Sequence, residues 1–298
     1  MATDFRRRFL FKNGIARGAY VQIQRGLKDI PSYQNAPSLL KRYLAEVLAA
    51  SILLSSTIKF NGSLLLQIRG QGKLKYLVAE ATSEASYRGS ISWNEEENFT
   101  SNLSLKDVLG AEAICTVSVR NKEGKDWQGV VPLGNDSIGE ILQHYMVQSE
   151  GLLTTFEFAW QEDVGIKAML LQRLPQEGRA TTNHVNSELK EAQEEETWHT
   201  IKTLEETLTT EELSTLTLPE IIRRLFHEYE VVLYPVEPFE YKCQCNWEKT
   251  ADTLRFLGEK ESEKMARERG QVDLTCGYCG KVYRYSNQEL NQVFQDKT

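Results

Sequence analysis

The sequence predicts an α+β protein: an N-terminal core of sheet and helix, a helical linker and a small C-terminal four-cysteine zinc domain. Short β-rich segments, several of them bounded by glycine or Asn-Gly, recur through the first half of the chain. One long apolar segment with helical periodicity lies among them. Four of the five cysteines fall in the last 56 residues. We therefore place the core at 1–178, the linker at 179–232 and the zinc-binding domain at 233–298.

The core segments alternate between strand and helix patterns. The predicted strands are 5–11, 63–68, 73–80, 113–119 and 128–133, followed by a hairpin of 153–160 and 166–171 around the turn 162–165. Together they predict an antiparallel or mixed sheet. The segment 38–56 is apolar almost all round, so we expect it to be a helix buried against that sheet. A second helix is expected at 137–147, with Asn135 or Asp136 as its N-cap.

A change of composition after residues 174–178 marks the linker. Residues 184–230 contain twelve glutamates against Lys190, Lys202, Arg223 and Arg224, a net charge of −8 in a chain whose total is −7. Two short amphipathic helices are expected there, the second starting at Pro219. Their apolar stripes are Ile201, Leu204 and Leu208, and then Ile221, Leu225 and Phe226. These stripes either dock permanently on the sheet or dock conditionally, because helices this short are marginal alone in water.

The cysteines form two short-spaced pairs, Cys243-Gln-Cys245 and Cys276-Gly-Tyr-Cys279. Two such pairs can supply the four tetrahedral ligands of Zn²⁺, and thiolates select zinc or an iron–sulfur centre over harder ions. We expect 239–245 to approach the metal as a strand and 275–280 to form a tight turn whose glycines permit positive φ.

Between the cysteine pairs, 250–257 and 261–269 are predicted to be polar helices. Their apolar stripe is Leu254, Leu257 and Met265, which is too thin for an independent core. Zinc binding, worth about 10 kcal/mol in small peptides, would then be folding energy for this domain.

A purely structural zinc site and a redox switch both fit the cysteine pattern. Each pair places two thiols close enough to form a disulfide, and zinc keeps all four as the thiolates that peroxide attacks. The Cys-x-Cys ring would be strained when closed, and therefore easily reversed. Cys115 lies in an apolar strand and is expected to be an inert buried residue.

Several functional classes fit less well. No apolar run reaches the length of a membrane span, and Arg6 to Arg8 are not followed by the apolar core of a secretory signal, so we expect a cytoplasmic protein without membrane partners. No phosphate-binding loop is present. A zinc-ribbon nucleic-acid binder would need a basic face. A dithiol oxidoreductase would need its first thiol at a helix start, but strand-like residues follow Cys279. Both remain alternatives.

The cysteine pattern, closing with Tyr283-x-Tyr285, resembles the redox switch of the bacterial redox-regulated 33 kDa heat-shock chaperone family. The resemblance extends over nearly the whole chain. It includes segments 57–67, 70–75, 88–89 and 127–133. The chain departs from the family's Ser-Glu-Gln-x-Pro-Thr string, with Gly151 and Leu153 in place of glutamine and proline, so the family's loop geometry there is not carried over.

The resemblance implies an ATP-independent holdase rather than an enzyme, with one Zn²⁺ per chain in its reduced, inactive form. It further implies that oxidation forms Cys243–Cys245 and Cys276–Cys279 disulfides, releases zinc, unfolds the C-terminal domain and loosens the linker. Unfolded client proteins would then bind to exposed apolar surface, and the activated form would be a homodimer. We hypothesise that the six apolar linker residues named above contribute to client binding.

Overall fold

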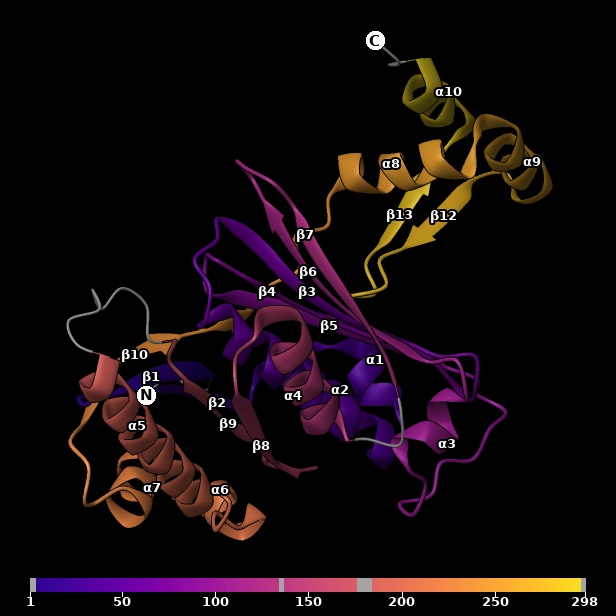
Figure 1. The fold of residues 1–298 in the computed structure, drawn as a ribbon. Coiled ribbons are helices and arrows are strands. Elements are labelled where there is room, and N and C mark those ends of the chain that lie inside the picture. Colours follow the sequence, from indigo (N-terminus) through magenta and orange to yellow (C-terminus); the bar gives the residue numbers. More distant parts are fainter. Residues whose placement is uncertain (1–3, 134–136, 176–183, 296–298) are drawn as a thin grey trace.

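Two antiparallel sheets with helices between and outside them form the body of the molecule (Figure 1). The computed structural model describes residues 4–133, 137–175 and 184–295. Sheet A has the order β10-β1-β2-β9-β8, and sheet B has the order β11-β5-β4-β3-β6-β7. Within sheet B only the short pairing of β11 with β5 is parallel. The predicted α+β class is confirmed.

The bounds of the strands agree closely with most of the predicted segments. In sheet A they are β1 Phe5–Phe11, β2 Ala16–Ile23, β8 Thr154–Gln161, β9 Gly165–Arg173 and β10 Val231–Pro238. In sheet B they are β3 Gly62–Arg69, β4 Leu74–Thr82, β5 Ser86–Trp93, β6 Ile114–Asn121, β7 Trp127–Pro132 and β11 Glu240–Tyr241. Strands β2 and β5 were not predicted. Their Ala, Gly and Ser residues have weak strand propensity, and pairing on both sides holds them extended.

Helix α2 (Ser38–Ser55) lies between the two sheets and forms the centre of the core, as its apolar character predicted. It packs against β2, β8 and β9 of sheet A and against β3, β4 and β5 of sheet B. Strand β9 shows how sheet A separates two layers: Leu170 belongs to the α2 side, whereas Met169 and Leu171 belong to the opposite side.

Helix α4 (Ile138–Glu150) covers β8 and β7, and its start corrects one expectation. The N-cap is Ser137, whose hydroxyl accepts from the amide of Glu140 while the Glu140 carboxylate accepts from the Ser137 amide. Asn135 and Asp136 lie outside the described residues. A Ser-x-x-Glu capping box satisfies two orphan donors together, which explains why it determines the helix start. The helix ends at Gly151, which adopts φ +65°.

The linker contains three helices, α5 (His184–Glu205), α6 (Thr210–Thr215) and α7 (Leu218–Leu225), which lie on the outer side of sheet A (Figure 1). Our expectation of one helical face for Ile201, Leu204 and Leu208 was wrong, because Leu208 lies in the turn between α5 and α6. A proline near the start of α7 is confirmed. The three-domain division stays a prediction: its first boundary lies outside the described residues, and β10 runs across its second.

The C-terminal lobe (243–295) projects beyond sheet B (Figure 1). It contains α8 (Trp247–Leu257), α9 (Glu259–Arg269), β12 (Val272–Thr275), β13 (Val282–Tyr285) and α10 (Asn287–Gln295). Its core is larger than the predicted stripe and differs from it, since Leu254 is buried but Leu257 is 45% exposed. The buried residues are Ala251, Leu254, Ala266, Val272, Tyr283, Tyr285, Leu290 and Val293. Strand β13 and helix α10 therefore complete a core that α8 and α9 could not form alone.

Three short helices complete the body of the molecule. They are η1 (Gly26–Asp29), α1 (Pro31–Asn35) and α3 (Leu105–Leu109). Both α1 and η1 follow β2 and lie near β5 and β11, so they border the edge of sheet B at which the C-terminal lobe is attached.

Candidate metal centre

The four cysteines of the C-terminal lobe converge on one point. Their Sγ atoms all lie within 4.8 Å of one another. The Sγ atoms of Cys243 and Cys276 are 3.6 Å apart, and those of Cys245 and Cys279 are 3.4 Å apart. Four sulfurs placed tetrahedrally about 2.3 Å from one Zn²⁺ would be about 3.8 Å apart. All four are free thiols, so their number, chemistry and spacing fit a four-thiolate ion such as zinc.

Local chain geometry explains how the second pair is presented. Cys276 and Cys279 lie in the turn between β12 and β13, where the Cys276 amide donates to Lys281 O (2.9 Å) and the Gly280 amide donates to Cys276 O (2.9 Å). Gly280 has φ +72°, a conformation that side chains disfavour. The predicted tight turn is confirmed.

The first pair follows β11, which is much shorter than the strand expected at 239–245. Residues Glu240 and Tyr241 pair in parallel with Ser86 and Tyr87 of β5, and the chain then leaves sheet B before Cys243. This brief pairing anchors the metal centre at the edge of the core sheet.

A tyrosine hydroxyl contacts the metal centre directly. Tyr283 Oη donates to Cys245 Sγ at 3.2 Å. Partial burial opposes the thiolate, but hydrogen bonds from Tyr283 and the neighbouring thiols lower the pKa of Cys245 to about 7. Burial raises the pKa of the Cys243 thiol to about 12. From the sequence, Tyr283 was expected in a strand and as part of the Tyr-x-Tyr pair that closes the cysteine pattern, without a contact to sulfur. Its position four residues after Cys279, on the face that alternates toward the lobe core, is the signal that could have identified it.

Arg88, a residue of the core domain, also reaches the cysteines. It lies on β5, forms a 2.5 Å ion pair with Glu80 of β4 and stacks on Tyr278 in the turn between Cys276 and Cys279, with its guanidinium carbon 4.2 Å from the ring centroid. Burial opposes its charge, yet Glu80, Tyr278 and Cys243 raise the pKa of Arg88 above its usual value. Nothing local in the sequence links Arg88 to residues almost two hundred positions away.

Cys115 is separate from this centre. It lies on β6 with 1% of its surface exposed, and burial raises its pKa to about 12. The prediction of a buried strand residue is confirmed, and a raised pKa agrees with the expectation of an inert thiol.

The six apolar linker residues meet at the outer face of sheet A. Five of them are buried and Leu204 is partly buried. Phe226 packs edge-to-face on Phe11 of β1, with ring centroids 5.1 Å apart. Sheet A therefore supplies the surface that covers them, and their role in client binding stays a proposal.

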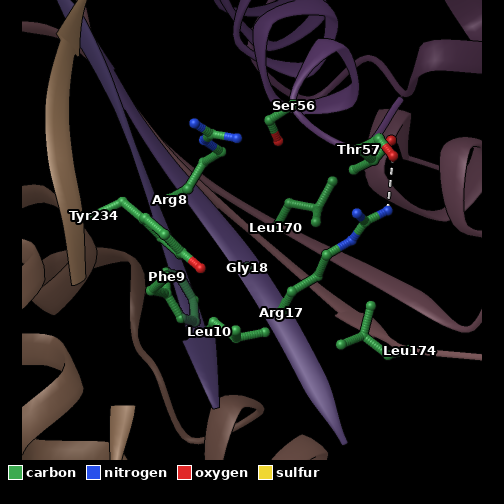
Figure 2. Close-up of a pocket in the computed structure, with 10 residues that line it drawn as sticks. All are labelled: Arg8, Phe9, Leu10, Arg17, Gly18, Ser56, Thr57, Leu170, Leu174 and Tyr234. Carbon is green, nitrogen blue, oxygen red and sulfur yellow. Dashed lines mark hydrogen bonds between the residues drawn. The ribbon is translucent and has the colours of Figure 1, made fainter. Parts of the chain in front are cut away.

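A hollow of about 290 Å³ lies on the α2 side of β1 and β2 and contains two arginines (Figure 2). Arg17 donates to Thr57 O at 2.8 Å, beyond the end of α2, and to the side chain of Gln172. Arg8 pairs with Glu237 of β10. Cationic side chains near the carbonyl end of a helix are stabilising. The hollow is therefore explained by the attachment of α2 to sheet A.

Comparison with known proteins gives one consistent result. The family model described as Hsp33 protein matches residues 4–286. The 33 kDa chaperonin of Neisseria meningitidis serogroup A is 36% identical over 98% of this chain and 91% of its own length. That of Chromobacterium violaceum is 34% identical over 98% and 94%. The crystal structure of the 33 kDa chaperonin from Thermotoga maritima has the same fold, with a TM-score of 0.80 and 20% identity over 98% of both chains.

The described helices include none with the length and apolar character needed to cross a bilayer.

Proposed function

The chain belongs to the Hsp33 family, whose relatives are named chaperonins, and from this membership we propose that it is an ATP-independent holdase controlled by oxidation. The observation that carries the redox part is the convergence of four free thiols within 4.8 Å at the edge of the core. In the reduced state Cys243, Cys245, Cys276 and Cys279 would hold one Zn²⁺, and the ion would keep the thiols deprotonated. This form is inactive because the linker covers sheet A.

Oxidation would convert each cysteine pair into a disulfide, Cys243 with Cys245 and Cys276 with Cys279. Two thiolates lose two electrons as the S–S bond forms, and a peroxide gains them as its O–O bond breaks and two protons are taken up to give two waters. The disulfide sulfurs no longer provide four thiolate ligands, so the metal leaves. Since sulfurs of different pairs also lie within 3.6 Å of one another, peptide mapping of the oxidised protein must establish the connectivity.

Loss of the metal would unfold the C-terminal lobe and free the chain that connects it to the linker. Strand β10 joins α7 to β11 and is the direct covalent route between the two regions. Undocking of α5 to α7 would then expose Ile201, Leu204, Leu208, Ile221, Leu225, Phe226 and the face of sheet A that they cover. This surface binds unfolded clients in the proposed active form, a homodimer in the cytoplasm.

Zinc release and aggregation suppression, measured on the same sample before and after peroxide at elevated temperature, test the proposal. We expect about one zinc per chain to be released and suppression of client aggregation to appear, and a thiol reductant to reverse the suppression. Zinc retention, or zinc release without any gain in suppression, would contradict the proposal and leave a structural metal site.

Charge substitutions test the client surface separately. Ile221→Glu and Leu225→Glu should weaken capture of unfolded protein by the oxidised form, because a charge cannot be buried against an apolar client without a large desolvation cost. Glu211→Gln, on the exposed side of α6, is the control. Unchanged capture by both apolar-site variants would remove these residues from the proposal.

A further inference from the structure

The C-terminal lobe contacts the core through a small set of side chains around Arg88. The Arg88 guanidinium carbon lies 4.2 Å from the ring centroid of Tyr278, which occupies the turn between Cys276 and Cys279. The same guanidinium lies close enough to the Cys243 thiol for their interaction to contribute to the raised pKa of Arg88. One arginine of sheet B thus contacts both cysteine segments of the metal centre.

Arg88 is held in place by its own strand neighbours. Glu80 lies directly opposite Arg88 in the pairing of β4 with β5. Its carboxylate accepts from Arg88 Nε at 2.6 Å and pairs with Nη2 at 2.5 Å. The side chains of Arg88 and Glu80 are only 18% and 12% exposed. An arginine side chain that stacks on an aromatic ring and contacts a carboxylate through two guanidinium nitrogens has little remaining rotamer freedom.

The backbone contacts next to Arg88 are few. The Glu240 amide donates to Ala85 O at 3.1 Å, and the Lys242 amide donates to Tyr87 O at 3.0 Å. Tyr241 Oη donates to Tyr278 O at 3.1 Å. A two-residue strand is marginal without side-chain support, so the attachment of the lobe depends on the contacts of Arg88 and Tyr278.

We propose that Arg88 is a positioning residue that holds the reduced metal centre on sheet B and releases it when Cys243 is oxidised. With its thiols deprotonated, the reduced centre would place negative sulfur beside the guanidinium, and opposite charges attract more strongly at a partly buried site than in bulk water. When the sulfur of Cys243 enters a disulfide, its negative charge disappears and Arg88 keeps only Glu80. The inference rests on the proposed function in taking the thiolate form as the resting state.

Hydrogen exchange at the Glu240 and Lys242 amides tests the proposal in the full-length protein. The main variant is Arg88→Gln combined with Glu80→Gln, which removes both charges without leaving one buried alone. In the reduced zinc form we expect these amides to exchange about tenfold faster, as expected for loss of a charged hydrogen bond. After oxidation we expect no difference from the unsubstituted protein, because the contact has already been lost.

Matched variants separate positioning from general stability. Arg88→Lys keeps the positive charge but not the planar guanidinium. The exchange rate of its Glu240 and Lys242 amides should lie between those of the double variant and the unsubstituted protein. Tyr278→Leu should also accelerate exchange, whereas Tyr278→Phe keeps the ring and should not. Arg284→Gln, on the exposed side of β13, is the control for loss of an arginine elsewhere in the lobe.

Two results would overturn the proposal. In the first, the Glu240 and Lys242 amides of the reduced double variant exchange no faster than those of the Arg284→Gln protein. In the second, their exchange in the double variant stays faster than in the unsubstituted protein after oxidation. The second result would mean that Arg88 only stabilises sheet B. If the double variant does not fold, the exchange rates of Tyr278→Leu and Tyr278→Phe decide the question. Equal rates in these two variants would then overturn the proposal. Exchange in the reduced protein does not depend on client binding, so a holdase that fails to suppress aggregation would refute the proposed function without refuting the Arg88 contact.

Discussion

The linker interface and the C-terminal lobe are held together by different forces. The linker docks on sheet A through seventeen buried apolar residues from both sides of the interface, whereas the lobe buries only eight. Three of the lobe's polar contacts converge on the cysteines. Under the proposed function a peroxide would act directly on the lobe, while the linker would respond to whatever weakens apolar burial. The comparison therefore separates oxidation and linker release into two proposed steps, connected through β10.

Removing one metal ligand should have the largest effect, and it should be confined to the lobe. Cys276→Ser leaves three thiolates, so the protein should lose stoichiometric zinc and with it up to about 10 kcal/mol of folding energy. Metal analysis and hydrogen exchange of residues 272–285 measure the result. Cys115→Ala, which alters the one cysteine outside the centre, should retain zinc. A Cys276→Ser protein with full zinc content would contradict the assignment of the ligands.

Truncating a buried aromatic side chain of the linker should affect the linker and leave the C-terminal lobe unchanged. Phe226 is 1% exposed and packs on Phe11, so Phe226→Ala should destabilise the linker by about 3–5 kcal/mol. Hydrogen exchange across 198–226 should increase while zinc content stays constant. Phe256→Ala in α8 is the matched control, since Phe256 is 95% exposed and should be neutral. Loss of zinc in Phe226→Ala would show that the two regions unfold as one unit.

The linker interface also contains a buried carboxyl, from which we expect its docking to depend on pH. Glu205, at the end of α5, is 0% exposed; Oε1 accepts from Thr155 Oγ1 at 2.9 Å, and Oε2 has no hydrogen-bond partner among the described residues. Burial, then the nearby Glu157 carboxylate, raises the pKa of Glu205 from 4.5 to about 8. Glu206 also raises it, whereas Thr155 and Lys202 lower it.

The direction of the pH dependence follows from that raised pKa. In the docked linker Glu205 keeps its proton to a higher pH than it does in the undocked linker. The protonated carboxyl therefore contributes fully to docking below about pH 4.5, and this contribution is lost as the pH rises through about 8. Glu205→Gln should remove the pH dependence of linker docking. At pH 9 it should slow hydrogen exchange of residues 198–226 by roughly tenfold or more, because each pKa unit corresponds to about a tenfold change in the docking equilibrium. Exchange of 272–285 should not change with Glu205→Gln. An equal pH response in Glu205→Gln would contradict the assignment.

Helix caps provide the smallest and most closely matched comparison. The Thr209 hydroxyl accepts from the Glu212 amide in the linker, and the Ser286 hydroxyl accepts from the Glu289 amide in the lobe. Replacing either by alanine should cost about 1 kcal/mol. If the regions are independent, Thr209→Ala should increase exchange only in the linker and Ser286→Ala only in the lobe. Increased exchange in both regions from either variant would mean that they are coupled in the resting state.

Much of the metal centre was predictable because its chemistry is local. Thiol spacing along the chain and the preference of thiolates for zinc identify Cys243, Cys245, Cys276 and Cys279 before any fold is known. The burial of α2 was predictable for a similar reason, since a helix that is apolar all round must be covered on every side.

The errors have physical causes that local patterns do not contain. The cap of α4 is Ser137 because its partner Glu140 forms a reciprocal pair, a geometry that neither Asn135 nor Asp136 alone reveals. Leu208 leaves the predicted stripe because α5 ends at Glu205. Strands β2 and β5 were missed because their small residues are held extended by neighbours on both sides.

The sequence by itself determined the four candidate metal-binding cysteines, the main strands and helices of the core and the acidic character of the linker, because these depend on residue chemistry and on spacing along the chain. Only the tertiary structure decided that sheet A covers the linker, that β10 and β11 attach to different sheets, and that Arg88 contacts Cys243 and Tyr278. These contacts join residues up to more than two hundred positions apart. Their pairing depends on which surfaces the folded chain brings together, and no local periodicity specifies it.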